Sequence, residues 1–177
     1  MTENVLLRST GLPSIGATDG RRLEVIATGL PLHRGVPLGI DATLVSPVRA
    51  DGILWPKAAK EDGVALARAE RAKATTYPEL VASPVVRLVT VAMEVGGRMS
   101  TSTRQLLRQL ARAKARAAPA ALRAAARTAW VARWTSLLSV AAQSALAATL
   151  VDDAVVVLDG TDGATPSHAD VCLDSAR

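Results

Sequence analysis

The spacing of apolar residues changes along the chain, and these changes predict an α/β domain. Short apolar runs rich in β-branched residues predict strands at residues 23–28, 38–46 and 85–95. A segment rich in proline and glycine separates the first two runs, which indicates an antiparallel hairpin. The third run is apolar almost throughout, as is typical of a central strand buried on both faces.

Apolar residues with helical spacing follow the hairpin and the third strand. Residues 61–77 predict a helix between the second and third strands, and such a crossover makes these two strands parallel. Beyond the third strand, Ser100 or Thr101 is a suitable N-cap for a helix that ends at Arg116. A further helix is expected from Pro119 to about Leu150.

The predicted fold class is therefore α/β, with a small mixed sheet on a β-β-α-β core and a helical C-terminal half. A chain of 177 residues has room for one such domain and a sizeable core. We expect this domain at residues 21–150. Residues 1–20 are expected to form an irregular leader, and residues 151–177 an acidic, flexible tail.

Composition narrows the possible chemistry. The chain has one cysteine and two histidines, which exclude an intrachain disulfide and a zinc site made of cysteine and histidine. The N-terminus lacks a basic segment followed by an apolar run, so no secretory signal is indicated. We therefore expect a nuclear or cytoplasmic protein that is not secreted.

Positive charge is concentrated in the helical half. The net charge is +5, and no acidic residue occurs from Val95 to Val151, where nine basic residues lie. Four arginines recur every fourth residue and form a stripe on the predicted helix: Arg104, Arg108, Arg112 and Arg116. Such a stripe is able to follow a DNA backbone, although solvated basic helices are also common.

A stretch without charge lies at residues 134–151 and approaches the length of a membrane-spanning helix. Serine, threonine and glutamine interrupt it, and much of the remainder is alanine. A buried or partner-facing helix is therefore the better interpretation, without a membrane as partner. Trp130 and Trp134 are four residues apart and are expected to anchor a helix pair.

Two carboxylates interrupt the apolar strands of the predicted hairpin. Glu24 and Asp41 are able to converge at one edge of the sheet, where paired carboxylates suit Mg²⁺. The alternative is a carboxylate that faces solvent or pairs with an arginine such as Arg22. The turn at Gly96–Gly97, followed by Arg98, is compatible with phosphate binding at a helix N-terminus, but also with a plain tight turn.

Several blocks of the sequence carry a family resemblance: RLEV at residues 22–25, GIDATLVSP at 39–47, the helix with Glu70, Lys73 and Tyr77, and VAMEVGGR at 91–98. Together they resemble the restriction-endonuclease-like domain, of the PD-(D/E)XK type, found at the C-terminus of some non-LTR retrotransposon polyproteins. The similarity spans roughly residues 20–150.

The resemblance implies a DNA endonuclease with Asp41 and Glu24 as Mg²⁺ ligands. Glu24 stands where the family usually has aspartate, and Thr43 where it usually has lysine. Lys73 is available as the cation, with Tyr77 one helical turn further. These departures predict weak or absent cleavage.

DNA is the expected partner, contacted by Arg98 and the arginine stripe, and a reverse transcriptase in a parent polyprotein is a further one. The alternatives are a non-catalytic nucleic-acid-binding remnant and an unselected transposon relic. The oligomeric state is not indicated by the sequence.

Overall fold

A computed structural model gives the arrangement of residues 2–12, 14–81 and 83–158. The strands are β1 (Thr2–Leu6), β2 (Arg22–Ala27), β3 (Leu38–Val45) and β4 (Arg87–Glu94). The α-helices are α1 (Val64–Thr76), α2 (Pro78–Val81), α3 (Thr101–Ala115) and α4 (Arg123–Leu158). Short 3₁₀ turns lie at Leu7–Thr10, His33–Gly35 and Ala120–Leu122.

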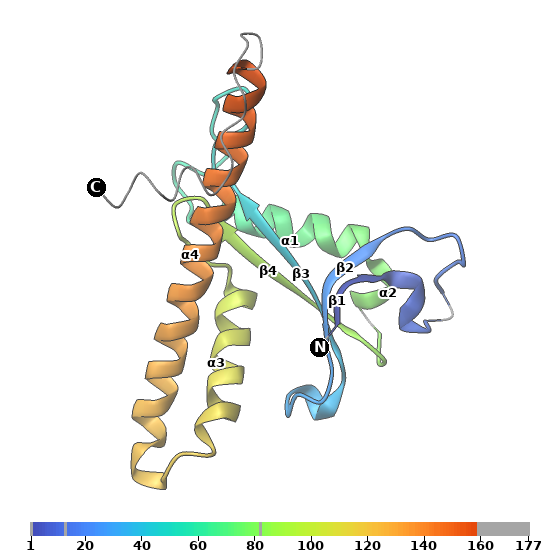
Figure 1. The fold of residues 1–177 in the computed structure, drawn as a ribbon, viewed down its shortest axis with the longest axis vertical. Helices are drawn as coiled ribbons and strands as arrows, with labels where there is room; N and C mark the ends of the chain where they lie inside the picture. Colours follow the sequence, from blue (N-terminus) through green and yellow to red (C-terminus); the bar gives the residue numbers. More distant parts are fainter. Residues whose placement is uncertain (1, 13, 82, 159–177) are drawn as a thin grey trace. The chain divides into compact units, whose positions relative to one another are not determined.

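The four strands form one mixed sheet in the order β1-β2-β3-β4 (Figure 1). β1 and β2 are antiparallel, as are β2 and β3, whereas β4 runs parallel to β3 after the α1 crossover. The predicted hairpin, the crossover helix and the mixed sheet are therefore confirmed.

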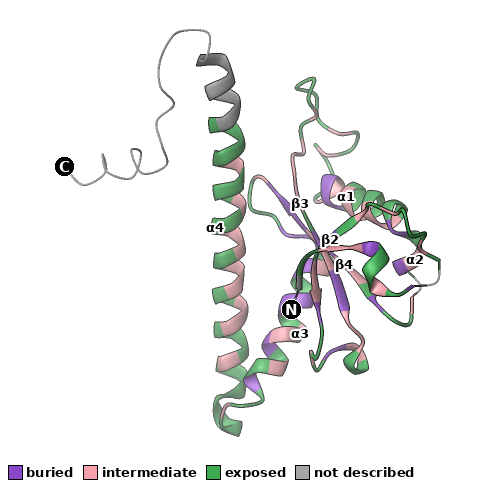
Figure 2. Cartoon of the chain, turned by 45° about the vertical axis from the view of Figure 1, so that its right-hand side comes forward, coloured by how far each residue is buried: buried purple, intermediate pink, exposed green. Residues whose placement is uncertain are grey.

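Helices cover both faces of the sheet (Figure 2). On one face, Tyr77 and Leu80 pack with Leu23 and Val86 in a buried cluster. On the other face, Leu106 of α3 packs against residues of β2 and β3. Burial of these apolar side chains is the main source of stability for such a layered arrangement.

The helical half begins with α3, whose N-cap is one of the two residues predicted for it. The Ser100 side chain accepts a hydrogen bond from the backbone N–H of Thr103 and so caps α3. Within residues 1–142, which form one compact unit, Trp134 and Leu138 of α4 pack against a buried cluster that includes Leu107 of α3. The Trp130 and Trp134 rings are 5.2 Å apart. Trp134 thus anchors the helix pair, as predicted.

Two expectations about the chain ends need correction. The leader predicted at residues 1–20 contains β1, which pairs with β2, and the buried Leu7 and Leu12. The tail predicted from residue 151 instead continues α4 to Leu158, and its remainder lies outside the described residues.

The position of β4 in the sheet also differs from the prediction. β4 was expected to be a central strand, but it is at the edge of the sheet among the described strands. Its apolar composition reflects helices packed on both of its faces, because a strand covered on both sides needs apolar residues wherever it lies in the sheet.

One helical stretch of the described chain, Ala120–Val151, is long and apolar enough to cross a membrane by length and composition. None of its apolar window is buried in the described structure, so the expectation of a buried helix is wrong, and the alternative of a partner-facing helix stays a prediction. One helix of this kind is weak evidence for a membrane span. The prediction that no membrane is bound stays a prediction.

Candidate active site and basic helices

A buried ion pair joins the sheet to the crossover helix. Asp41 lies in the middle of β3 and is only 3% exposed. The Lys73 ammonium on α1 is 2.9 Å from Asp41 Oδ2, and the lysine side chain is 29% exposed. Oδ2 is buried and accepts no hydrogen bond of good geometry, so its contact with Lys73 is purely that of an ion pair. Burial of a carboxylate is costly unless a cation compensates it.

Tyr77 is the residue that follows α1, and it lies beside this ion pair. Its hydroxyl donates a hydrogen bond of 2.6 Å to the backbone carbonyl of Arg22 on β2. Burial raises the pKa of Tyr77 to about 12, and the negative charge of Asp41 adds to the rise. Tyr77 is therefore a neutral hydrogen-bond donor at physiological pH.

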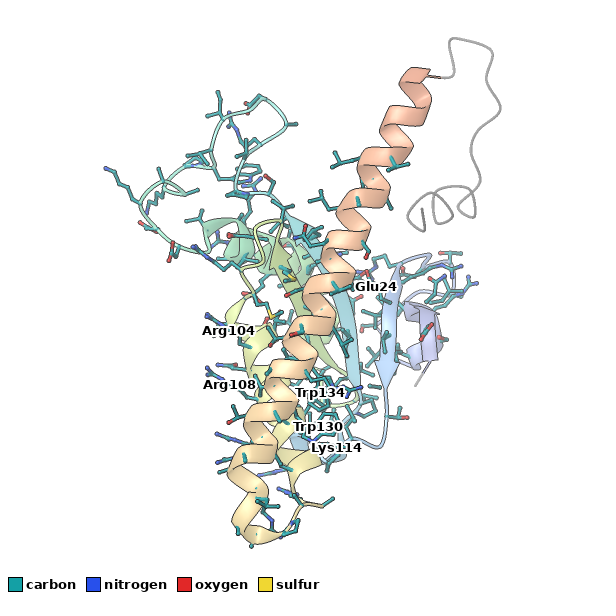
Figure 3. The ribbon with its side chains drawn as sticks, turned by 60° about the vertical axis from the view of Figure 1, so that its left-hand side comes forward. Glu24, Arg104, Arg108, Lys114, Trp130 and Trp134 are labelled. Atoms are coloured by element: carbon teal, nitrogen blue, oxygen red, sulfur yellow. The ribbon has the colours of Figure 1, made fainter. Side chains whose placement is uncertain are left out.

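Glu24 reaches the same region from β2. Pairing between β2 and β3 covers Val25–Ala27 and Leu38–Ile40. Just past this pairing, Glu24 Oε2 accepts a hydrogen bond of 3.0 Å from the backbone N–H of Ala42, the residue after Asp41. The exposed carboxylate of Glu24 (Figure 3) therefore lies next to the backbone of the buried aspartate.

The four side chains predicted to be catalytic are thus brought together: Glu24, Asp41, Lys73 and Tyr77. Three structural elements supply them. β2 and β3 are neighbours, and the right-handed crossover places α1 over the face of β3 from which Asp41 projects. This convergence follows from the topology, because Glu24, Asp41 and the Lys73–Tyr77 pair belong to three segments that are separated in sequence.

An open pocket of about 370 Å³ adjoins the ion pair and is lined by Thr43 and Lys73. Arg68 and Trp55 form another part of its wall, with the Arg68 guanidinium 4.0 Å from the centre of the Trp55 ring. Arg49 lies 5.8 Å from the same ring centre. Cationic groups held over an aromatic ring beside a carboxylate site suit a phosphate-bearing ligand.

Sequence reasoning missed the Trp55, Arg68 and Arg49 cluster. The loop after β3 is held by a hydrogen bond of 3.2 Å from Trp55 Nε1 to the Ser46 carbonyl. This contact brings the tryptophan back to the end of β3, within reach of α1. The sequence shows only a tryptophan with one of these arginines before it and the other after it, and such a pattern does not specify a long-range contact.

The arginine stripe of α3 is exposed to solvent at every position: Arg104, Arg108, Arg112 and Arg116. Arg104 and Arg108 extend outward from α3 (Figure 3). Arg127 of α4 joins Arg108 and Arg112 in lining an open groove of about 480 Å³. Lys114 adds a cation 5.4 Å from the centre of the Trp130 ring. Basic side chains of α3 and of the first turns of α4 are therefore gathered around this groove.

Arg98 does not share the environment of the stripe. Its guanidinium is 2.7 Å from Asp62 and 3.7 Å from Glu94, so two carboxylates neutralise it. The Gly96–Gly97 turn is closed by its own backbone, since Gly97 N–H donates to the Glu94 carbonyl. This geometry is that of a tight turn, and Arg98 stabilises it.

The donor set allows a test of the predicted Mg²⁺ site. No group of three or more His, Cys, Asp or Glu side chains that could hold a metal occurs within the described residues. Mg²⁺ sites often use only one or two carboxylates and complete the shell with water and substrate phosphate. Asp41 Oδ2 has unused acceptor capacity, and the Glu24 carboxylate contacts the backbone of Ala42, the next residue, so the two residues fit such a site.

Comparison of the chain with family models, with curated proteins and with solved structures found no match.

Proposed function

We propose that this chain is a metal-dependent DNA endonuclease-like domain with low cleavage activity, derived from a retrotransposon polyprotein. The observation that carries the proposal is the buried Asp41 carboxylate paired at 2.9 Å with Lys73, which lines a pocket that also holds arginines. The mixed sheet and the family resemblance in the sequence support the same function. The proposed partner is a reverse transcriptase encoded in the same parent polyprotein.

Asp41 and Glu24 would hold Mg²⁺. When bound, the ion supplies Lewis-acid activation of a phosphodiester oxygen and lowers the pKa of a bound water. Asp41 is fixed in the sheet, and Glu24 is oriented by the Ala42 N–H, so the protein positions both carboxylates. These restraints hold the ligands in place without substrate.

Lys73 would take the role of the lysine that the family usually has on the strand, at the position of Thr43. Its ammonium lies beside Asp41 and on the wall of the pocket, where it would stabilise charge that develops on the phosphate. Tyr77 is protonated at neutral pH and donates its hydroxyl proton to the Arg22 carbonyl, so it would position β2 beside Asp41 and would not act as a base. Arg68 and Arg49 would hold the neighbouring phosphate.

Low activity follows from the same contacts. Lys73 already compensates the charge of Asp41, and each shift of its ammonium toward a phosphate weakens that compensation. A positioned electrostatic group that is displaced or lost typically costs about 10²–10³ in rate. The basic α3–α4 hairpin would supply DNA affinity that does not depend on sequence.

Plasmid cleavage with Mg²⁺ or Mn²⁺ tests the proposal. We expect slow nicking by the wild-type chain, none by Asp41→Ala, and strongly reduced nicking by Lys73→Ala. Because Thr43 and Lys73 line the same pocket, the double variant Lys73→Ala/Thr43→Lys should recover part of the activity. Cleavage that survives Asp41→Ala would refute the assignment.

A second function is a non-catalytic nucleic-acid-binding domain. It is favoured by Thr43 at the position expected for lysine and by the exposed arginines of α3. In this case DNA binding is retained in Asp41→Ala, and neither the wild type nor the double variant cleaves DNA. A gel-shift measurement beside the cleavage assay separates the two functions.

A further inference from the structure

The outer edge of β4 is only partly satisfied by the rest of the chain. Arg87 N–H donates to the Pro37 carbonyl, and Val95 N–H to the Val45 carbonyl, so odd-numbered residues of β4 bond to β3. Backbone groups alternate in direction along a strand. The N–H and C=O groups of Leu88, Thr90, Ala92 and Glu94 therefore point away from β3, toward the open edge.

The C-terminal half of this edge is closed by the segment that leads into α3. Ser100 N–H donates to the Ala92 carbonyl, and Glu94 N–H donates to the Arg98 carbonyl. The Ala92 N–H donates to Thr103 Oγ1 at 3.0 Å. These side-chain and backbone contacts imitate a neighbouring strand over residues 92–94.

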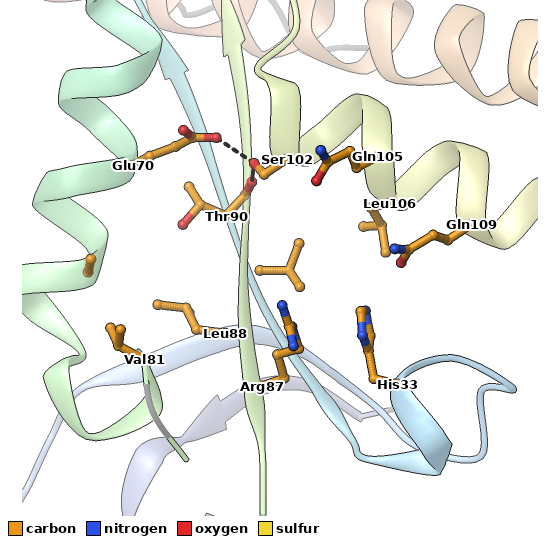
Figure 4. A pocket seen from close by; sticks show the side chains of 12 residues that line it. His33, Glu70, Val81, Arg87, Leu88, Thr90, Ser102, Gln105, Leu106 and Gln109 are labelled. Atoms are coloured by element: carbon orange, nitrogen blue, oxygen red, sulfur yellow. Dashed lines mark hydrogen bonds between the residues drawn. The ribbon is translucent and has the colours of Figure 1, made fainter. Parts of the chain in front are cut away.

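The N-terminal half of the edge has a different environment. The Thr90 carbonyl accepts a hydrogen bond of 2.8 Å from Ser102 Oγ. Within the described part of the chain, the Leu88 N–H, the Leu88 carbonyl and the Thr90 N–H have no hydrogen-bond partner. Leu88 and Thr90 are among the residues that line a pocket of about 280 Å³ along residues 87–90 (Figure 4).

The walls of this pocket lie on the two sides of the strand edge. Ala74 of α1 and Val81 of α2 provide apolar surface on one side. Gln105 and Gln109 of α3 provide amide groups on the other side. A strand added at the edge would direct alternate side chains toward these two walls.

We propose that the open edge at Leu88–Thr90 is a docking site for an extended peptide segment of a partner protein. The peptide adds a short strand to the sheet, accepts hydrogen bonds from the Leu88 and Thr90 N–H groups, and donates one to the Leu88 carbonyl. Its residues alternate between apolar, against Ala74 and Val81, and polar, against the α3 glutamines. The three unpaired backbone groups select this occupant, because their spacing is that of a β-ladder.

The experiment uses the full chain and a display library of peptides of about six residues, with alternating apolar and polar positions. Selected peptides are measured by titration calorimetry. Leu88→Pro removes the outward N–H and leaves the bonds to β3 intact, and should weaken binding about three- to tenfold. Leu88→Ala keeps the N–H and is the matched control for the lost side chain.

A second measurement keeps the proposal falsifiable if Leu88→Pro does not fold. Selected peptides are N-methylated at one amide at a time, and methylation should abolish binding only at the amides on one edge of the peptide. The proposal is overturned if no peptide binds, if methylation has no alternating effect, or if Leu88→Ala loses as much affinity as Leu88→Pro. It is also overturned if the free chain forms a dimer that Leu88→Pro disrupts, because the edge then pairs with a second copy.

Discussion

The ionisation of Tyr77 provides a direct measurement of the cluster around Asp41. Tyr77 is the only tyrosine in the chain, so the absorbance change of phenolate formation reports this residue alone. Burial raises its pKa to about 12, and the negative charge of Asp41 contributes to the rise. Compared with the ordinary value of 10, this pKa means that the fold favours the phenol over the phenolate by roughly 2–3 kcal/mol.

The perturbation is Asp41→Asn, which removes the negative charge and preserves the shape of the side chain. We expect the pKa of Tyr77 to fall below 12 but to stay above 10, because burial is the largest cause of the rise and remains. Glu61→Gln serves as the control, since Glu61 is an exposed carboxylate whose cation partner is Lys57.

The sign of the linked stability change is also fixed. Because the pKa of Tyr77 is raised in the folded chain, the associated stability is present below pH 10 and is lost as the pH rises toward 12. Circular dichroism at each pH shows whether the chain is still folded when the phenol titrates. A wild-type pKa near 10 would refute the burial of the phenol beside Asp41. A pKa in Asp41→Asn equal to that of the wild type would refute the proximity of the two side chains.

Three further predictions concern DNA binding, the ion pair and acid stability. The DNA-binding variant replaces three exposed arginines of α3 by alanine: Arg104, Arg108 and Arg112. It should bind duplex DNA more weakly, and its slope of log K against log salt should be flatter by about 2.7, since each lost phosphate contact contributes about 0.9. The control replaces three arginines outside α3 and should leave the slope almost unchanged: Arg8, Arg22 and Arg34. An unchanged affinity in the α3 variant would show that the stripe is only a solvated surface. In urea unfolding, Lys73→Ala should lower the free energy of unfolding by about 1–3 kcal/mol, because it leaves the buried Asp41 carboxylate without its cation. This loss is smaller than for a fully buried pair, since the lysine is partly exposed, and Asp41→Asn should cost less still. Equal losses in the two variants would contradict this reasoning. Hydrogen bonds from Arg21 lower the pKa of Asp19 below 3.8, so stability should fall as the pH drops below that value, and thermal unfolding of Asp19→Asn should lack this acid dependence.

The parts of the fold that depend on local pattern were predictable from the sequence. The β2–β3 hairpin and α1 follow from periodicity, and the α3 cap follows from a serine ahead of the apolar spacing. The parallel direction of β4 then follows from the crossover between two strands of one sheet. Each of these inferences needs only residues that are close in sequence.

β1 and the order of the sheet were not predictable in this way. The residues of β1 include exposed polar side chains at Glu3 and Asn4, and the strand is defined by antiparallel pairing of residues 2–6 with residues 22–26. A polar edge strand has little periodic signal of its own. For β4, apolar composition reports how many faces are covered and does not report how many neighbouring strands there are.

Local sequence patterns were also insufficient to predict the contacts of the candidate site. Lys73 was expected near Asp41 because of the family resemblance, and the contact depends on the position of α1 over the sheet. Trp55 and Arg68 come together through a loop whose path is fixed by backbone contacts such as Trp55 N–H to the Pro47 carbonyl. No local pattern in the sequence specifies that path.

The charges around Asp41 explain why a threonine at position 43 is compatible with a metal site. Asp41 and Glu24 carry two negative charges, and Lys73 contributes one positive charge, which leaves a net negative charge beside the pocket. A divalent cation is attracted to such a site, whereas a second lysine at position 43 would neutralise it. Thr43 and Lys73 line the same pocket, so a lysine at either position places its ammonium on the same side of Asp41. One cation is sufficient to compensate the buried carboxylate, and a second would compete with the metal for it. In the proposed function, the lysine on α1 would therefore take the place of the expected strand lysine, and it is restrained less firmly because it approaches from a helix and is partly exposed.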